Sequence, residues 1–322
     1  MTAAQSPSRR QMLQWTAAAA LTVAVRNSLA PAADAPQPAD NPVAKMFSAK
    51  LEVTDLGDGL HLVANGGGNV LISSTADGIL VIDSGMSFRA KDYLTVADSL
   101  APNAKRKIVF NTHWHMDHTG GNADFAGAGY VIAGSANCRK RMGQKITMED
   151  IGMTSEPSPE IARPVMTFDE SMDFAQGAPA HILKIAPAHT DSDAIVLFPT
   201  SGILHTGDVH FNGTFPVIDR STNGSLDGMI AASKRVLELC DTKTRIVPGH
   251  GPMADKTTLA AQLALLELTR DRLAPLGEKK LSIDEVLAKA PLADLDDKWG
   301  RGFLRSPIYT RMAYGQWLTA GK

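Results

Sequence analysis

Histidine and aspartate side chains cluster in residues 113–118, which read HWHMDH. Four side chains of the kinds that bind metal ions lie in this hexapeptide: His113, His115, Asp117 and His118. Because side chains alternate along an extended segment, the first two histidines point to one side of the chain. The chain then turns, so that the aspartate and the third histidine can face a second point. The spacing therefore predicts a metal site in a loop that follows a buried strand.

Three more residues of these kinds occur farther along the chain, at His189, Asp208 and His250. Each follows a short apolar run of the kind that forms a β-strand, so each is expected in a loop at a strand end. Rigid elements commonly hold functional side chains in such loops. A surface histidine or a turn aspartate explains any one of these residues equally well, but the ordered set together with residues 113–118 favours a metal centre.

The seven side chains offer five imidazoles and two carboxylates but no thiolate. Nitrogen and oxygen ligands of this kind suit zinc first, with iron or manganese as alternatives. Seven ligands exceed the needs of one tetrahedral site, so the sequence predicts two Zn2+ ions. The two cysteines, Cys138 and Cys240, lie outside the pattern, and the sequence leaves open whether they pair. Cys240 continues a helical apolar stripe, which predicts a buried thiol.

The elements that must position these residues are short apolar strands and amphipathic helices. Strands are predicted over Leu60–Ala64, Val70–Ser73, Ile79–Ile82, Lys107–Phe110, Tyr130–Ala133, Ile182–Ile185, Ala194–Phe198, Ile203–His205 and Arg245–Val247. Helices are predicted over Ser87–Leu100 and Leu226–Cys240, along the leucine stripe Leu259–Leu273, and after the capping box formed by Ser282 and Glu285. Strand meanders and strand–helix units in one chain indicate an α/β fold in which two sheets are sandwiched between helices.

From about Leu60 to Gly251 the chain resembles the metallo-β-lactamase superfamily. The resemblance implies an αββα sandwich of two mixed β-sheets flanked by helices, with metals at one edge of the sheets and helices added at the C-terminus. It also implies one metal held by His113, His115 and His189, a second held by Asp117, His118 and His250, and Asp208 as the bridge between them. Asp83 matches the first motif of the family and is expected to support the metal loop.

Differences from the family pattern indicate which branch of the superfamily the chain resembles. β-Lactamases of the commonest class have cysteine, and another class has serine, where this chain has Asp208, so a bridging aspartate resembles glyoxalase II, lactonases and related hydrolases. Flavo-diiron proteins have glutamate at the position of His115. Acyl-homoserine lactonases have a tyrosine where this chain has Phe211, and the basic glutathione-binding residues of glyoxalase II are not evident.

The chemistry that this site implies is hydrolysis. Two close cations make hydroxide available near neutral pH, and Asp117 is placed to orient the nucleophile and pass a proton, so Asp117 and Asp208 are the candidate catalytic residues. The expected substrate is an ester, lactone, thioester or amide, including a β-lactam. A mononuclear iron sulfur (persulfide) dioxygenase and a non-catalytic periplasmic metal-binding protein are the alternatives. The methionine-rich segment 142–174 forms either a substrate lid or ordinary core, and Pro216–Asp219 is a second candidate rim loop.

Residues 1–30 have the features of an export signal. Paired arginines, Arg9 and Arg10, precede an apolar stretch over Trp15–Val25 and a small-residue cleavage site ending at Ala30. The pair resembles the twin-arginine motif, which predicts a periplasmic location in a bacterium. The predicted organisation is a signal peptide over 1–30, a linker rich in proline and alanine over 31–45, a catalytic domain over 46–255 and a C-terminal helical extension over 256–322.

The composition excludes several classes of protein. Of 322 residues, 44% are hydrophobic and 20% are charged, as in an ordinary globular protein. The net charge of −2 lacks the basic excess of nucleic-acid-binding proteins, and no apolar run reaches the roughly 18 residues of a membrane span. We therefore expect a small-molecule substrate and neither nucleic acid nor a membrane span. The aromatic residues of segment 299–317 cover either the core or a partner subunit in a homodimer.

Overall fold

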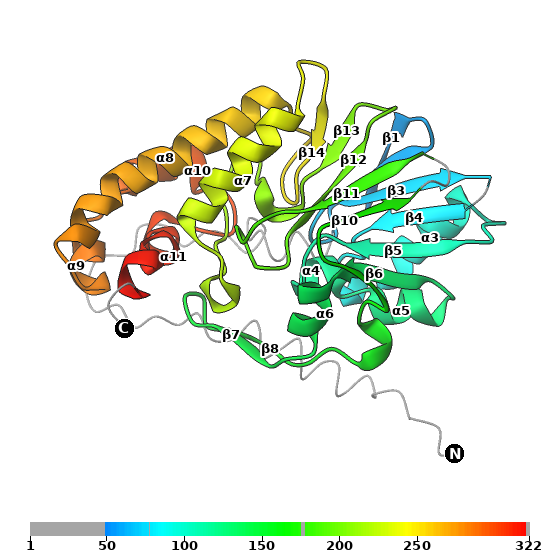
Figure 1. Ribbon diagram of the computed structural model, residues 1–322, viewed down its shortest axis with the longest axis horizontal. Coiled ribbons are helices and arrows are strands. Elements are labelled where there is room, and N and C mark those ends of the chain that lie inside the picture. The colour runs from blue at the N-terminus through cyan, green and yellow to red at the C-terminus, as the bar shows by residue number, and fades with distance from the viewer. Residues whose placement is uncertain (1–48, 77, 175–177, 320–322) are drawn as a thin grey trace. The chain divides into compact units, whose positions relative to one another are not determined.

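The computed structural model describes residues 49–76, 78–174 and 178–319 (Figure 1). The predicted signal peptide and linker lie outside these described residues. Within the described part of the chain, none of the helices combines the length and the apolar character needed to cross a membrane.

The first large sheet has seven strands in the order β1-β2-β3-β4-β5-β6-β9. Strands β1 to β4 form an antiparallel meander, and β4, β5, β6 and β9 run parallel. The strands span Glu52–Gly57, Leu60–Ala64, Val70–Thr75, Gly78–Ile82, Lys107–Asn111, Val131–Ser135 and Met166–Phe168. The parallel half brings the carboxyl ends of β4 and β5 to one edge, which is where residues 113–118 follow.

The second large sheet has five strands in the order β10-β11-β12-β13-β14. Its neighbours are antiparallel except for the parallel pair β13 and β14. The strands span Ser171–Phe174, Ala180–Lys184, Ala194–Phe198, Ile203–His205 and Arg245–Val247. A separate hairpin pairs β7 (Ile146–Met148) with β8 (Met153–Ser155).

Helices cover the outer faces of both sheets (Figure 1). In the first half of the chain they are η2 (Ser87–Arg89), α3 (Ala90–Leu100), α4 (Met116–Thr119), α5 (Asn122–Gly127), α6 (Ala136–Met142) and η3 (Glu160–Ala162). In the second half they are η4 (Gly207–Val209), η5 (Arg220–Thr222), α7 (Leu226–Leu239), α8 (Lys256–Glu278), α9 (Ile283–Ala288), η6 (Ala293–Leu295), α10 (Asp296–Trp299) and α11 (Ser306–Thr319).

Consecutive strand residues pack into different layers of the molecule. In β3, Leu71 joins the cluster between the two sheets, whereas Ile72 joins the cluster beneath α3 and α5. In β12, Val196 faces the cluster between the sheets, and Ile195 faces the cluster shared with α7, α8 and α11. Side chains alternate across a strand, so strands covered on both faces are apolar throughout. The chain therefore has the αββα sandwich that the sequence predicts, with C-terminal helices packed on the second sheet.

Most of the predicted elements are present, and the differences have local causes. Strands β2, β12, β13 and β14 have the predicted bounds, and the capping box at Ser282 opens α9 as expected. Strand β1 was not predicted because nearly all of its side chains are exposed, so it lacks a hydrophobic pattern. Residues 116–119 form the short helix α4 instead of an open loop, and the Thr119 hydroxyl donates to the His115 carbonyl there.

The sequence gave alternatives for the two cysteines and for segments 142–174 and 299–317, and the structure shows that both buried and exposed side chains occur in the two segments. Both cysteines are free, and Cys240 is 5% exposed within the core, as predicted. In segment 142–174, Met142 is buried in a core cluster, whereas Met153 lies on the surface with 38% of its area exposed. Among the aromatic residues of segment 299–317, Tyr309 and Tyr314 pack in the core, but Phe303 is 59% exposed.

Candidate metal centre

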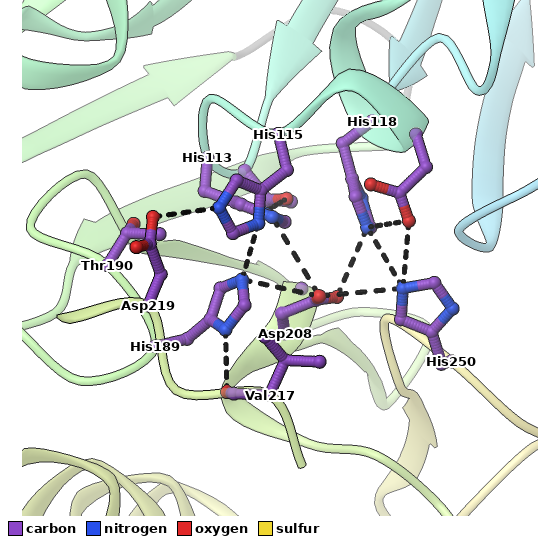
Figure 2. Close-up of polar contacts among 12 residues, drawn as sticks. His113, His115, His118, His189, Thr190, Asp208, Val217, Asp219 and His250 are labelled. Atoms are coloured by element: carbon purple, nitrogen blue, oxygen red, sulfur yellow. Dashed lines mark hydrogen bonds and ion pairs between the residues drawn. The ribbon is translucent and has the colours of Figure 1, made fainter. Parts of the chain in front are cut away.

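The structure brings all seven predicted ligand residues together at one edge of the two sheets (Figure 2). Two groups form, and the ligand atoms within each group lie within 4.8 Å of one another. The first group is His113, His115, His189 and Asp208, and the second is Asp117, His118 and His250. Strand ends from both sheets supply them, because residues 113–118 follow β5 of the first sheet and the other three follow β11, β13 and β14 of the second.

Asp208 lies between the two groups. Its Oδ1 is 3.2 Å from the Nε2 of His118 in the second group. Its Oδ2 is 3.4 Å from the Nε2 of His189 in the first group and 3.5 Å from the Nε2 of His250 in the second. Figure 2 shows the carboxylate at the centre of this set of contacts. Asp208 is thus placed to contact ions in both groups.

Hydrogen bonds fix the orientation of three of the rings from outside. His118 Nδ1 lies 2.7 Å from the Asp83 carboxylate, and His189 Nδ1 lies 2.8 Å from the Val217 carbonyl. His115 Nε2 lies 3.0 Å from the Asp219 carboxylate. A ring nitrogen that donates outward leaves the opposite nitrogen unprotonated and free to bind a metal. His118 and His189 therefore direct Nε2 into the centre, and His115 directs Nδ1 into it.

Asp83 supports the metal loop, as the sequence predicted. Its carboxylate accepts hydrogen bonds from the backbone N–H and the hydroxyl of Thr112, at 2.7 and 2.8 Å, and contacts His118. The residue is completely buried and has a left-handed backbone with φ of 65°. Such a backbone is uncommon outside glycine and is best tolerated by aspartate and asparagine. The turn after β4 thus aims this carboxylate at the loop that carries the ligands.

Asp219 is a functional residue that the sequence located only as part of a rim loop. Its buried carboxylate accepts hydrogen bonds from the backbone N–H and hydroxyl of Ser221 and from the hydroxyl of Thr222, besides holding His115. Burial by itself raises the pKa of Asp219, but the hydrogen bonds from His115, Ser221 and Thr222 outweigh it and hold the pKa well below its ordinary value. The sequence predicted a rim loop over Pro216–Asp219 because this segment closely follows Asp208, but nothing in it indicated the distant histidine.

We expect Asp219→Ala to weaken binding of the first metal by about 10- to 100-fold, because loss of an outer hydrogen-bond partner of a metal-binding histidine typically costs that much. Chelator competition with zinc measures the effect. Ser221→Ala is the matched control, since it removes one partner of the carboxylate but leaves the contact with His115 intact. Equal affinities of the two variants would contradict a positioning role for Asp219.

Two buried atoms of the first group indicate that the centre fits a metal ion. Among the described residues, His113 Nε2 is buried without a hydrogen-bond partner, and Asp208 Oδ1 is buried and makes no hydrogen bond, although it lies 3.2 Å from His118 Nε2. A buried polar atom without a partner costs about 1–3 kcal/mol, so such atoms are rare in folded proteins. A cation coordinated by these atoms removes that cost, and the nitrogen and oxygen donor set suits zinc, iron or manganese.

The electrostatics of the two groups differ. Burial lowers the pKa of His189 to about 4, and burial together with neighbouring His118 holds the pKa of His113 well below its ordinary value. Both rings are therefore neutral near pH 7, which is the form that binds metals. Burial also disfavours the charged form of His250, but the carboxylates of Asp208 and Asp117 outweigh it and raise the pKa of His250 to about 10. Metal binding by the second group therefore releases a proton.

We expect His189 and His210 each to contribute a loss of stability to the metal-free protein as the pH falls from 6.5 towards 4. Burial lowers the pKa of His189 and of His210 to about 4, below the ordinary value of 6.5. In this window the unfolded chain binds protons that the folded chain does not, so the free energy of unfolding decreases as the pH falls. The decrease between pH 7 and 5 should be about 2 kcal/mol for each histidine. Urea unfolding of chelator-treated wild type and of His210→Gln at each pH measures the contribution of His210, and the same pH dependence in both proteins would contradict the prediction.

Solvent reaches the centre through the second group. In the first group, the side chains of His113, His189 and Asp208 are at most 4% exposed. In the second group, the side chains of Asp117 and His250 are 24% and 28% exposed. The centre is therefore most accessible at these two residues.

Comparison with known proteins agrees with this geometry. The family model described as the metallo-beta-lactamase superfamily matches residues 64–277. The chain belongs to this superfamily. Together with the two histidine and aspartate groups, membership identifies the chain as a metal-dependent hydrolase with a site suited to two metal ions.

Solved structures of the superfamily share the fold. A metallo-beta-lactamase from Pontibacter korlensis is 23% identical with a TM-score of 0.56, and the match covers 68% of this chain and 99% of that one. A stereoselective inverting sec-alkylsulfatase from a Pseudomonas species is 17% identical with a TM-score of 0.64, and the match covers 83% of this chain and 50% of that one. At these identities the similarity concerns the fold.

Proposed function

We propose that the protein is an exported dinuclear zinc hydrolase of the branch with a bridging aspartate. The observation that carries the proposal is the position of Asp208, whose two carboxylate oxygens lie between the two ligand groups. A carboxylate that faces both groups favours two metals over one. The proposed location is the periplasm, which rests on the twin-arginine pattern at Arg9 and Arg10 alone.

The residues of the centre have different proposed roles in hydrolysis. When bound, two metals supply a water of lowered pKa and polarise the electrophilic carbonyl of the substrate. Asp117 lies on the accessible side, where its Oδ2 is 3.1 Å from His250 Nε2. We assign Asp117 to orient the nucleophile and to pass a proton to the leaving group. Neither Cys138 nor Cys240 belongs to the centre, so no thiol nucleophile takes part.

The proposed substrates are small esters, lactones, thioesters and amides, including β-lactams. Each presents a carbonyl carbon to the nucleophile, and the exposed side of the centre admits them over Asp117 and His250. Because a structural relative is a sec-alkylsulfatase, a secondary alkyl sulfate belongs in the same substrate panel. Phe211 stacks on the ring of His250, so an aromatic surface, without a hydroxyl group, flanks the second group.

Elemental analysis of the exported, mature protein tests the proposal, combined with the substrate panel. We expect about two zinc ions per chain, together with hydrolysis that Asp117→Asn abolishes. About one iron per chain, with oxygen uptake on a persulfide, would identify a dioxygenase instead. Full metal loading without turnover of any ester, lactam or thiol substrate would identify a metal-binding protein.

A further inference from the structure

Gln262 lies outside every metal-binding motif, yet its amide is bonded to the segment that follows Asp208. The residue belongs to α8 and is completely buried. Its Nε2 donates to the Val209 carbonyl at 2.8 Å, and its Oε1 accepts from the Phe211 N–H at 2.8 Å. A backbone carbonyl can only accept and a backbone N–H can only donate, so these two contacts fix the orientation of the amide.

The same oxygen of Gln262 lies 3.1 Å from His210 Nδ1. Because Oε1 is an acceptor, this ring nitrogen must carry the proton. One side chain on α8 thus satisfies three consecutive residues, 209 to 211, and all of the groups involved are buried. Removal of the amide leaves two donors and one acceptor without partners in the interior.

The segment that Gln262 holds touches ligands of both groups. Asp208 occupies η4 directly before it. The ring of Phe211 stacks on His250, with centroids 5.1 Å apart and planes at 14°, and lies 5.9 Å from the ring of His189. An isolated β-bridge also pairs Phe211 with His250. A shift of this segment therefore moves the bridging carboxylate and one ring of the second group together.

We propose that Gln262 is a positioning residue of the metal centre, through which α8 fixes Asp208 and His250. The inference rests on the proposed dinuclear function. Packing alone does not explain the residue, because Leu259, Leu266 and Leu273 of α8 are fully buried in the same core. An apolar side chain fills such a site at less desolvation cost than an amide. The amide is distinguished from these leucines by its bonds to the segment after Asp208.

Gln262→Leu tests the proposal, with Thr269→Val as the matched control. Thr269 is also a fully buried polar residue of α8, but its hydroxyl bonds only Leu265 and Tyr309, away from the centre. Urea unfolding measures the stability of both variants. Chelator competition with zinc measures the two metal affinities, and the absorption spectrum of the cobalt-loaded protein reports the ligand geometry.

We expect Gln262→Leu to lower the affinity for the second metal by about 10- to 100-fold, because loss of an outer hydrogen-bond partner of a metal site typically costs that much. The absorption spectrum of the cobalt-loaded protein should change as well. The first metal should change less, because Val217 and Asp219 hold its histidines independently. Thr269→Val should lower stability but leave both affinities unchanged. A folded Gln262→Leu variant with wild-type affinities and spectrum would overturn the proposal.

A second variant keeps the test decisive if Gln262→Leu does not fold. Gln262→Met retains nearly the length and volume of the side chain, and so disturbs the packing less than leucine, but it has neither the donor to the Val209 carbonyl nor the acceptor for the Phe211 N–H. It should also lower the affinity for the second metal, and unchanged affinity would overturn the proposal. Wild-type protein in the same titration separates the two proposals. Fewer than two zinc ions bound by wild type contradict the function itself, whereas two zinc ions bound by both proteins with equal affinities contradict only the role of Gln262.

Discussion

Asp208→Ala should empty both metal positions, whereas His250→Ala should empty mainly one. The carboxylate of Asp208 faces His118 and His250 of one group and His189 of the other, so its loss removes a ligand from each position. His250 faces only the second group. The loss of affinity should exceed the roughly 100-fold cost of losing an outer hydrogen-bond partner, because Asp208 itself is a proposed ligand.

Elemental analysis after gel filtration measures both variants. The expected content is about two zinc ions per chain for wild type, about one for His250→Ala and fewer than one for Asp208→Ala. Circular dichroism shows whether each variant is folded, and Asp208→Asn keeps the side-chain size if the alanine variant is not. Equal losses of a single zinc ion in both variants would contradict the bridging position of Asp208.

The sequence predicted the sandwich well because the strands that build it are buried on both faces. Strand β12 is apolar at every position, and it separates two of the core clusters. Continuous apolar runs of this kind stand out against the glycine-rich turns that bound them. Strand β1 carries almost no buried side chain, and the short hairpin of β7 and β8 is partly exposed, so neither gives such a signal.

The seven residues of the two groups were predicted from the sequence, but most of the residues that hold them in place were not. Ligand side chains cluster in residues 113–118, so their spacing is visible locally. By contrast, Asp219 lies 104 residues from His115, and Gln262 lies 51 residues from Phe211. An aspartate in a turn or a glutamine in a helix has many uses, and only the tertiary structure shows its partner. Asp83 was identified because it matched a family motif.

Substitution of two glycines next to the ligand side chains should also have a large effect on metal binding. At each of them an added methyl group would overlap a ligand side chain. A Cβ added at Gly249 would overlap Asp208 Oδ1 and lie 2.7 Å from the carbonyl carbon of Gly207. A Cβ added at Gly68 would overlap the imidazole of His118, lying 2.5 Å from Nε2. The Asp208 carboxylate and the His118 ring are buried, and the Gly207 carbonyl belongs to the backbone, so these neighbours cannot move aside cheaply.

We therefore expect Gly249→Ala to displace the Asp208 carboxylate and to lower the affinity for both metals. Gly68→Ala should displace the His118 ring and lower mainly the affinity for the second metal. Each substitution should also lower the free energy of unfolding by roughly 1–3 kcal/mol, the usual cost of overpacking a core. Gly127→Ala is the control, since no atom lies within 4 Å of the added Cβ, and it should leave zinc content unchanged. Zinc content and urea unfolding of the three variants measure these effects. If Gly249→Ala retained both metals at wild-type affinity, the Asp208 carboxylate would have to occupy a different position from the one described.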